Sequence, residues 1–153
     1  MNGKQVCILM VMAAALGFGS DSYCGTWKAN PVKTKLSPGS PELRKSELMT
    51  IDDMGPDQYR VTRTTSDGKS DSYGLMFDGK EHTGKQGSYA VGMRLAKRQL
   101  RNTLKGPKGM LVSEWVVSAD GTQLINTRKG NGTATGRPID EVFVYDRIPD
   151  KKN

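Results

Sequence analysis

Cys24-Gly25-Thr26-Trp27-Lys28-Ala29-Asn30-Pro31 is the stretch of sequence that decides the fold of this chain. Its Gly-x-Trp stands where a first β-strand is expected to begin. Short strand-like runs separated by turn residues follow it, and a segment of different composition precedes it. The stretch therefore marks the start of the folded domain.

The segment before this stretch has the pattern of a cleavable signal peptide. Lys4 is followed by a mostly apolar, uncharged run over residues 6–18, and small residues follow as far as position 22. The run is shorter than the ~20 apolar residues that a membrane-spanning helix needs. We therefore expect residues 1–20 to be a signal peptide, removed after Gly19 or Ser22. Residues 21–153 would form one exported domain, periplasmic or extracellular, without a transmembrane segment.

The charge of the chain is positive, and its cysteines are few. The 23 basic and 16 acidic residues give a formal net charge of +7. Cys24 is the only cysteine of the predicted mature chain, so no internal disulfide is expected. The densest basic segment contains no acid, and such runs are usually solvated faces of a hairpin. It carries no specific nucleic-acid motif. Its members are Arg94, Lys97, Arg98, Arg101, Lys105 and Lys108.

The rest of the chain predicts an all-β fold. Asp67-Gly68 and Asp120-Gly121 are typical of hairpin turns, and three prolines exclude a regular helix over residues 31–46. Eight or nine short strands at even spacing predict an antiparallel up-and-down meander, closed as a barrel or split into a sandwich. Short connections favour the barrel, which also leaves no exposed sheet edge. After the first strand, we expect strands near residues 48–51, 58–65, 72–77, 89–98, 99–104, 110–118, 122–129 and 141–148.

Three motifs carry a resemblance to known proteins. Gly25-Thr26-Trp27-Lys28 resembles the first strand of lipocalins and of fatty-acid-binding proteins. With Ala29-Asn30-Pro31, the hairpin at residues 117–124 and the ending at residues 142–147, the chain resembles small secreted lipocalin-like proteins of bacteria. The resemblance covers most of the predicted mature chain. It implies a barrel with Trp27 as a plug at the closed end and Arg147 stacked over its ring.

The chain also departs from the two classical families. It lacks the Thr-Asp-Tyr motif of lipocalins and a helix after the last strand, and residues 31–46 take the place of the helical lid of fatty-acid-binding proteins. The resemblance therefore implies the looser barrel group, and does not imply fatty-acid binding.

Residues suited to catalysis are scarce. His82 is the only histidine and is expected in an exposed turn over residues 80–86. A metal site of His82 with Asp78 and Glu81 would have few ligands. Asp52-Asp53 and Asp140-Glu141 are expected to be solvated acids at strand ends. We therefore predict no catalytic residues, no metal site, no cofactor and no enzymatic activity.

The remaining hypothesis is a binding cavity. One face of each strand must line the barrel interior, but both faces of the strand at residues 110–118 are apolar, so alternation does not decide which. The interior is either filled or hollow. We expect a binding protein for a small apolar or amphipathic ligand; the alternative is an envelope or surface protein whose basic hairpin contacts anionic polymers or a protein partner. The residues predicted to line a cavity are Tyr59, Tyr73, Met76, Met93 and Trp115.

Overall fold

The computed structural model describes residues 21–40, 47–84 and 86–150. The predicted signal peptide, residues 1–20, lies outside the described residues. The described chain is built from strands, and no segment of it is a helix long and apolar enough to cross a membrane. The ten strands are β1 (Gly25–Ala29), β2 (Leu48–Gly55), β3 (Gln58–Thr64), β4 (Ser70–Met76), β5 (Asp78–Thr83), β6 (Tyr89–Ala96), β7 (Gln99–Gly106), β8 (Gly109–Val117), β9 (Gln123–Asn131) and β10 (Pro138–Ile148).

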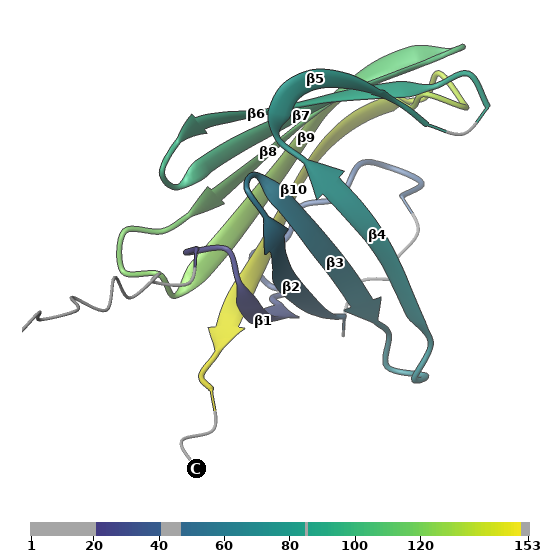
Figure 1. The fold of residues 1–153 in the computed structure, drawn as a ribbon. Helices are drawn as coiled ribbons and strands as arrows, with labels where there is room; N and C mark the ends of the chain where they lie inside the picture. The colour runs from purple at the N-terminus through teal and green to yellow at the C-terminus, as the bar shows by residue number, and fades with distance from the viewer. Residues whose placement is uncertain (1–20, 41–46, 85, 151–153) are drawn as a thin grey trace, which may run out of the picture.

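The strands form one antiparallel sheet that curls into a nearly closed barrel (Figure 1). Its order is β4-β3-β2-β1-β10-β9-β8-β7-β6-β5, so the first and last strands pair in the middle and β4 and β5 are the two edges. The predicted all-β barrel of sequential hairpins is confirmed. The number of strands is ten, slightly more than the eight or nine expected, because Asp78–Thr83 form β5 in place of the expected turns.

The segment after β1 extends the pairing of β10. Asn30 donates its backbone N–H to the Val144 carbonyl at 2.8 Å, and Lys35 and Val142 exchange two backbone hydrogen bonds. Beyond the end of β1, residues 35–37 thus lie beside β10. This satisfies backbone groups that the short first strand would leave without a partner. As expected, residues 31–40 contain turns and a bridge, and no helix.

The two edges of the sheet meet where the chain passes from β4 to β5. The backbone of Met76 and Phe77 lies directly against Gly92 of β6: a Cβ atom built on Gly92 would lie 1.9 Å from the Met76 carbonyl oxygen. The Phe77 amide donates to the Asp57 carbonyl at 2.8 Å. Close contact at Gly92 therefore joins the two edges without strand pairing.

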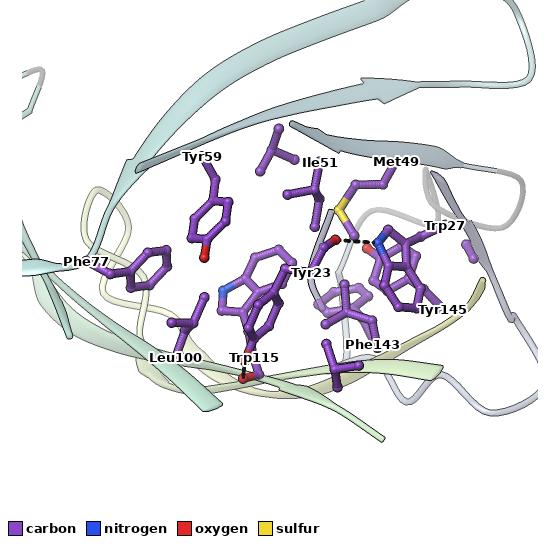
Figure 2. Close-up of a cluster of buried hydrophobic side chains, with 14 residues drawn as sticks. Tyr23, Trp27, Met49, Ile51, Tyr59, Phe77, Leu100, Trp115, Phe143 and Tyr145 are labelled. Carbon is purple, nitrogen blue, oxygen red and sulfur yellow. Dashed lines mark hydrogen bonds between the residues drawn. The ribbon is translucent and has the colours of Figure 1, made fainter. Parts of the chain in front are cut away.

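One end of the barrel is filled by a packed core (Figure 2). Trp27 is fully buried there, and its Nε1–H donates to the Tyr23 carbonyl at 2.9 Å. The Tyr23 hydroxyl in turn donates to the Trp115 carbonyl at 3.1 Å. Side chains from β2 and β3 face those from β7, β8 and β10 across this core (Figure 2). Its main members are Tyr23, Trp27, Met49, Ile51, Tyr59, Val61, Phe77, Leu100, Trp115, Leu124, Phe143 and Tyr145.

Arg147 covers the outer side of this end. Its Cζ atom lies 4.0 Å from the centroid of the Trp27 ring, the stacked pair that the resemblance implies. The same guanidinium donates to the Gly121 and Cys24 carbonyls at 2.7 and 2.8 Å. It thereby ties the residues before β1 to the turn between β8 and β9. Cys24 is a half-buried free thiol, and burial raises its pKa above the ordinary value.

Candidate ligand-binding cavity

The other half of the barrel is hollow. A cavity of about 390 Å³ lies between β3 and β4 on one side and β5 to β9 on the other. The packed core is its floor, and Trp115 belongs to both. The interior is thus filled toward the Trp27 end and hollow beyond Trp115. The apolar part of the cavity wall is formed by Tyr73, Leu75, Met76, Ala90, Leu104 and Trp115.

The five residues predicted to line a cavity have different positions. Tyr73 and Trp115 lie in the cavity wall, and Met76 lies at its rim with 37% of its surface exposed. Tyr59 is buried in the packed core, where its ring contacts those of Tyr23 and Phe77. Met93 lies on the outer surface, 48% exposed, opposite Arg101 in the pairing of β6 with β7. The structure brings three of the five together around one space.

A row of polar side chains crosses the inner face of the sheet. Asn102, Ser113, Arg128 and Glu141 are successive partners in the pairing of β7, β8, β9 and β10. Because partners directly opposite each other point to the same face, the four side chains form one belt across the barrel wall. Asn126 lies one step closer to the core, and its Nδ2–H₂ donates to Ser113 Oγ at 2.7 Å and the Glu114 carbonyl at 3.1 Å. The cavity therefore has an apolar floor and a polar belt.

Two arginines line the cavity, and each has a buried glutamate beside it. Arg128 Nη1 lies 3.4 Å from Glu141 Oε2, and Arg63 Nε lies 3.3 Å from Glu47 Oε1. The second pair is an ionic contact without hydrogen-bond geometry: among the described residues these two atoms have no hydrogen-bond partner. Glu141 was expected to be a solvated turn acid. It is 2% exposed instead, because it falls in the inward alternation of β10.

His82 is the third basic side chain in the cavity wall, after the two arginines. It lies in β5 and is half-buried, so the exposed turn expected over residues 80–86 is wrong for residues 80–83, whereas Gln86 does lie in a turn. Its Nε2 is 2.9 Å from Asp78 Oδ1, and this hydrogen bond lowers the pKa of Asp78. The described residues contain no group of three or more His, Cys, Asp or Glu side chains that could hold a metal ion.

A polar cluster joins the two halves of the barrel beside the packed core. Arg94 on β6 forms ion pairs of 2.9 Å with Asp21, ahead of β1, and with Asp57, in the turn between β2 and β3. The Tyr59 hydroxyl also donates to Asp21. Burial raises the pKa of Tyr59 above its ordinary value, and the hydrogen bond to the Asp21 carboxylate raises it further. The cluster holds the N-terminal residues of the domain across the end of the barrel.

The residues of the predicted basic patch differ in their surroundings. Arg94 belongs to the polar cluster described above, whereas the other five residues are exposed. Lys97 and Arg98 lie in the turn between β6 and β7, and Lys108 lies in the turn between β7 and β8 at the opposite end of β7. On the outer face of β7, Arg101 pairs with Glu114 at 2.5 Å, and Lys105 lies over the Tyr89 ring. The hypothesis of an anionic or protein partner stays a prediction.

Sequence reasoning did not predict the polar belt or the two buried glutamates beside the arginines. A signal for them exists in the strand alternation. Asn102 follows buried Leu100 at a spacing of two, and Asn126 and Arg128 follow buried Leu124 in the same way. A polar residue that lies two positions from a buried apolar residue on the same strand therefore points to the interior of the barrel.

Comparisons with known proteins identify the fold. No family model matches the chain, and no curated protein sequence matches it. Several solved structures, however, match the chain over most of its length. A Schistosoma mansoni fatty-acid-binding protein in complex with arachidonic acid has a TM-score of 0.60 and 18% identity, covering 84% of this chain and 97% of that chain. Fatty-acid-binding protein 1 of Echinococcus granulosus has a TM-score of 0.59 and 14% identity, covering 84% and 98%.

A third similar structure is zebrafish ileal bile-acid-binding protein complexed with cholic acid, with a TM-score of 0.55 and 13% identity, covering 83% of this chain and 99% of that chain. All three match the chain over most of its length at low identity, so the likeness is one of fold. The chain is therefore similar in fold to these fatty-acid-binding and bile-acid-binding proteins.

Proposed function

We propose that this protein is an exported binding protein that holds a small apolar or amphipathic molecule inside its barrel, and that it is not an enzyme. The observation that carries the proposal is the cavity of about 390 Å³, which is floored by Trp115 and walled by Tyr73, Leu75 and Leu104. Ligand pockets are typically roughly 300–1,000 Å³ and mostly apolar with a few polar groups. Two proteins of similar fold are described in complex with arachidonic acid and with cholic acid, which supports a ligand of this class.

Export is part of the proposal and is supported by the N-terminal sequence. The basic start, the apolar run and the small residues fit a signal peptide, and the motifs of the domain resemble secreted bacterial proteins. Of the two expected cleavage sites, the one after Gly19 keeps Asp21, whose carboxylate binds Arg94 and Tyr59. We therefore expect a periplasmic or extracellular protein that begins at Ser20.

The full chain, expressed in a bacterium and recovered from its periplasm, tests export and binding together by mass spectrometry. Under denaturing conditions we expect the mass of residues 20–153. Under native conditions we expect an additional mass of a small molecule that is lost when the protein unfolds. A mass of the uncleaved chain in the cytoplasmic fraction alone would refute export.

Blocking the cavity should strongly weaken binding of a neutral apolar dye. Ala90 lies in the cavity wall on β6, and Ala90→Trp places an indole in that space. In a titration with Nile red, we expect a fluorescence increase and blue shift with the unchanged protein, and affinity weaker by at least about tenfold in the variant.

The matched control is Val91→Trp, which adds an indole one position along the same strand, on the outer face. It should bind Nile red as the unchanged protein does, with both variants checked for a cooperative thermal transition. Equal Nile red affinity in the Ala90 and Val91 variants would show that the dye does not enter this cavity.

A further inference from the structure

The cavity wall contains two arginines whose charges are already balanced. Arg63 and Arg128 have 22% and 25% of their side chains exposed, whereas their partners Glu47 and Glu141 have 4% and 3%. The carboxylates therefore lie deeper in the wall than the guanidinium groups. Each arginine also lies over an aromatic ring, Arg63 over Tyr73 at 5.0 Å and Arg128 over Phe143 at 5.9 Å. Both arginines are thus held against the wall.

Balanced charges change what the cavity attracts. An arginine facing a cavity without a partner would favour a carboxylate or phosphate, because the guanidinium donates paired hydrogen bonds to such groups. Here a ligand carboxylate would have to give up its hydration and lie close to Glu47 or Glu141, which are buried and of the same charge. Desolvation and like-charge repulsion both oppose that arrangement. The two ion pairs therefore disfavour an anionic end group.

The other polar groups of the belt are neutral. Asn102, Ser113 and Asn126 are buried in the cavity wall, with exposed fractions of 8%, 7% and 3%. Amides and hydroxyls both donate and accept hydrogen bonds, so they match a ligand hydroxyl, which does the same. An alkyl chain against Trp115, Leu75 and Leu104 would place such a group near this belt.

From these contacts we propose that the cavity selects uncharged amphipathic molecules with a hydroxyl end group over the corresponding carboxylates. This inference rests on the proposed function, since it requires that the cavity take up a ligand. It adds the class of ligand: a long-chain alcohol or a related neutral lipid, and not a free fatty acid anion.

Competition for bound Nile red tests the preference, with lauryl alcohol and laurate at pH 8 as a pair that differs in the end group alone. We expect the alcohol to displace the dye with an affinity at least about tenfold higher than that of laurate. If Nile red and both competitors fail to bind, cavity binding itself is refuted, and this preference with it. If Nile red binds and laurate competes as well as or better than the alcohol, the preference alone is refuted.

Two variants test the physical cause. Glu141→Gln and Glu47→Gln each remove one negative charge beside an arginine while keeping the shape of the side chain. Each should shift the ratio of alcohol affinity to laurate affinity toward laurate by about tenfold. Because Glu141 lies on β10 and Glu47 immediately precedes β2, the two sites are separate, and either variant serves if the other fails to fold. Glu114→Gln, which removes an acid on the outer surface beside Arg101, is the matched control and should leave the ratio unchanged.

An unchanged ratio in a folded Glu141 or Glu47 variant would show that the buried glutamates do not set the preference. An equal shift in the Glu114 variant would show that the net charge of the protein, and not the cavity wall, decides which end group binds.

Discussion

Trp27→Ala should lower the free energy of unfolding by about 3–5 kcal/mol, the range for removing a large aromatic side chain from a core. Trp27 is fully buried at the closed end of the barrel, its Nε1–H binds the Tyr23 carbonyl, and Arg147 lies 4.0 Å from its ring centroid. The substitution leaves a cavity in the packed core at the closed end and removes a cation–π contact of about 0.5–2 kcal/mol. Urea denaturation followed by circular dichroism measures the loss.

Trp27→Phe is the matched control, because it keeps an aromatic ring at the closed end and removes only part of the volume together with the Nε1–H donor. It should cost clearly less than the alanine variant. A loss below about 1 kcal/mol for Trp27→Ala would mean that the end of the barrel is stable without its plug. The Gly-Thr-Trp stretch would then not organise the fold.

Most strands were predictable because their alternation is strong. In β8, for instance, Leu111, Ser113, Trp115 and Val117 are buried at intervals of two, and the strand lies within one residue of its expected bounds. The strand β5 was missed for the opposite reason. Asp78-Gly79-Lys80-Glu81-His82-Thr83 has no apolar residue and begins with a typical turn pair. It is a strand because β6 provides backbone partners along one side, and composition alone does not contain that information.

The choice of inner and outer face was the main limit for the site. Both faces of β8 are apolar, and Met93 is as apolar as Leu104, which lines the cavity. The faces are set by pairing between strands: Met93 lies opposite Arg101, which in turn lies opposite Glu114 on the outer surface. Neither partner is adjacent in sequence. Placing such a residue therefore requires the register of three strands at once.

For charged residues too, residue type alone did not predict which side chains are buried. Arg94 lies in a basic run, and Glu141 lies beside Asp140 at a strand start, so both side chains were expected to be exposed to solvent. Each is two residues from a buried position on its strand, Gly92 and Phe143. Strand alternation places both inside, and each has opposite charges that offset part of the cost of burial. For these two residues, the position in the strand alternation predicts burial better than residue type does.

Gly92→Ala should lower the free energy of unfolding by about 2–3 kcal/mol, in the upper part of the range for overpacking. Its added Cβ would lie 1.9 Å from the Met76 carbonyl oxygen and 3.1 Å from Phe77 Cα. Both are backbone atoms, so no side-chain rotation relieves the clash, and the crossing from β4 to β5 must move away from β6. Because β4 and β5 are not paired with each other, this close approach is a main contact between the two edges of the sheet.

Amide hydrogen exchange gives a local measurement beside urea denaturation. The Phe77 amide, which donates to the Asp57 carbonyl, should exchange faster in the Gly92 variant, whereas amides of β8 and β9 should keep their order of protection. Gly74→Ala is the matched control: its Cβ would have no neighbour within 4 Å, so stability should change by less than about 1 kcal/mol. Equal stability of the two variants would show that the crossing moves at little cost. The line between β4 and β5, beside the cavity, would then be a place where the barrel opens at low cost.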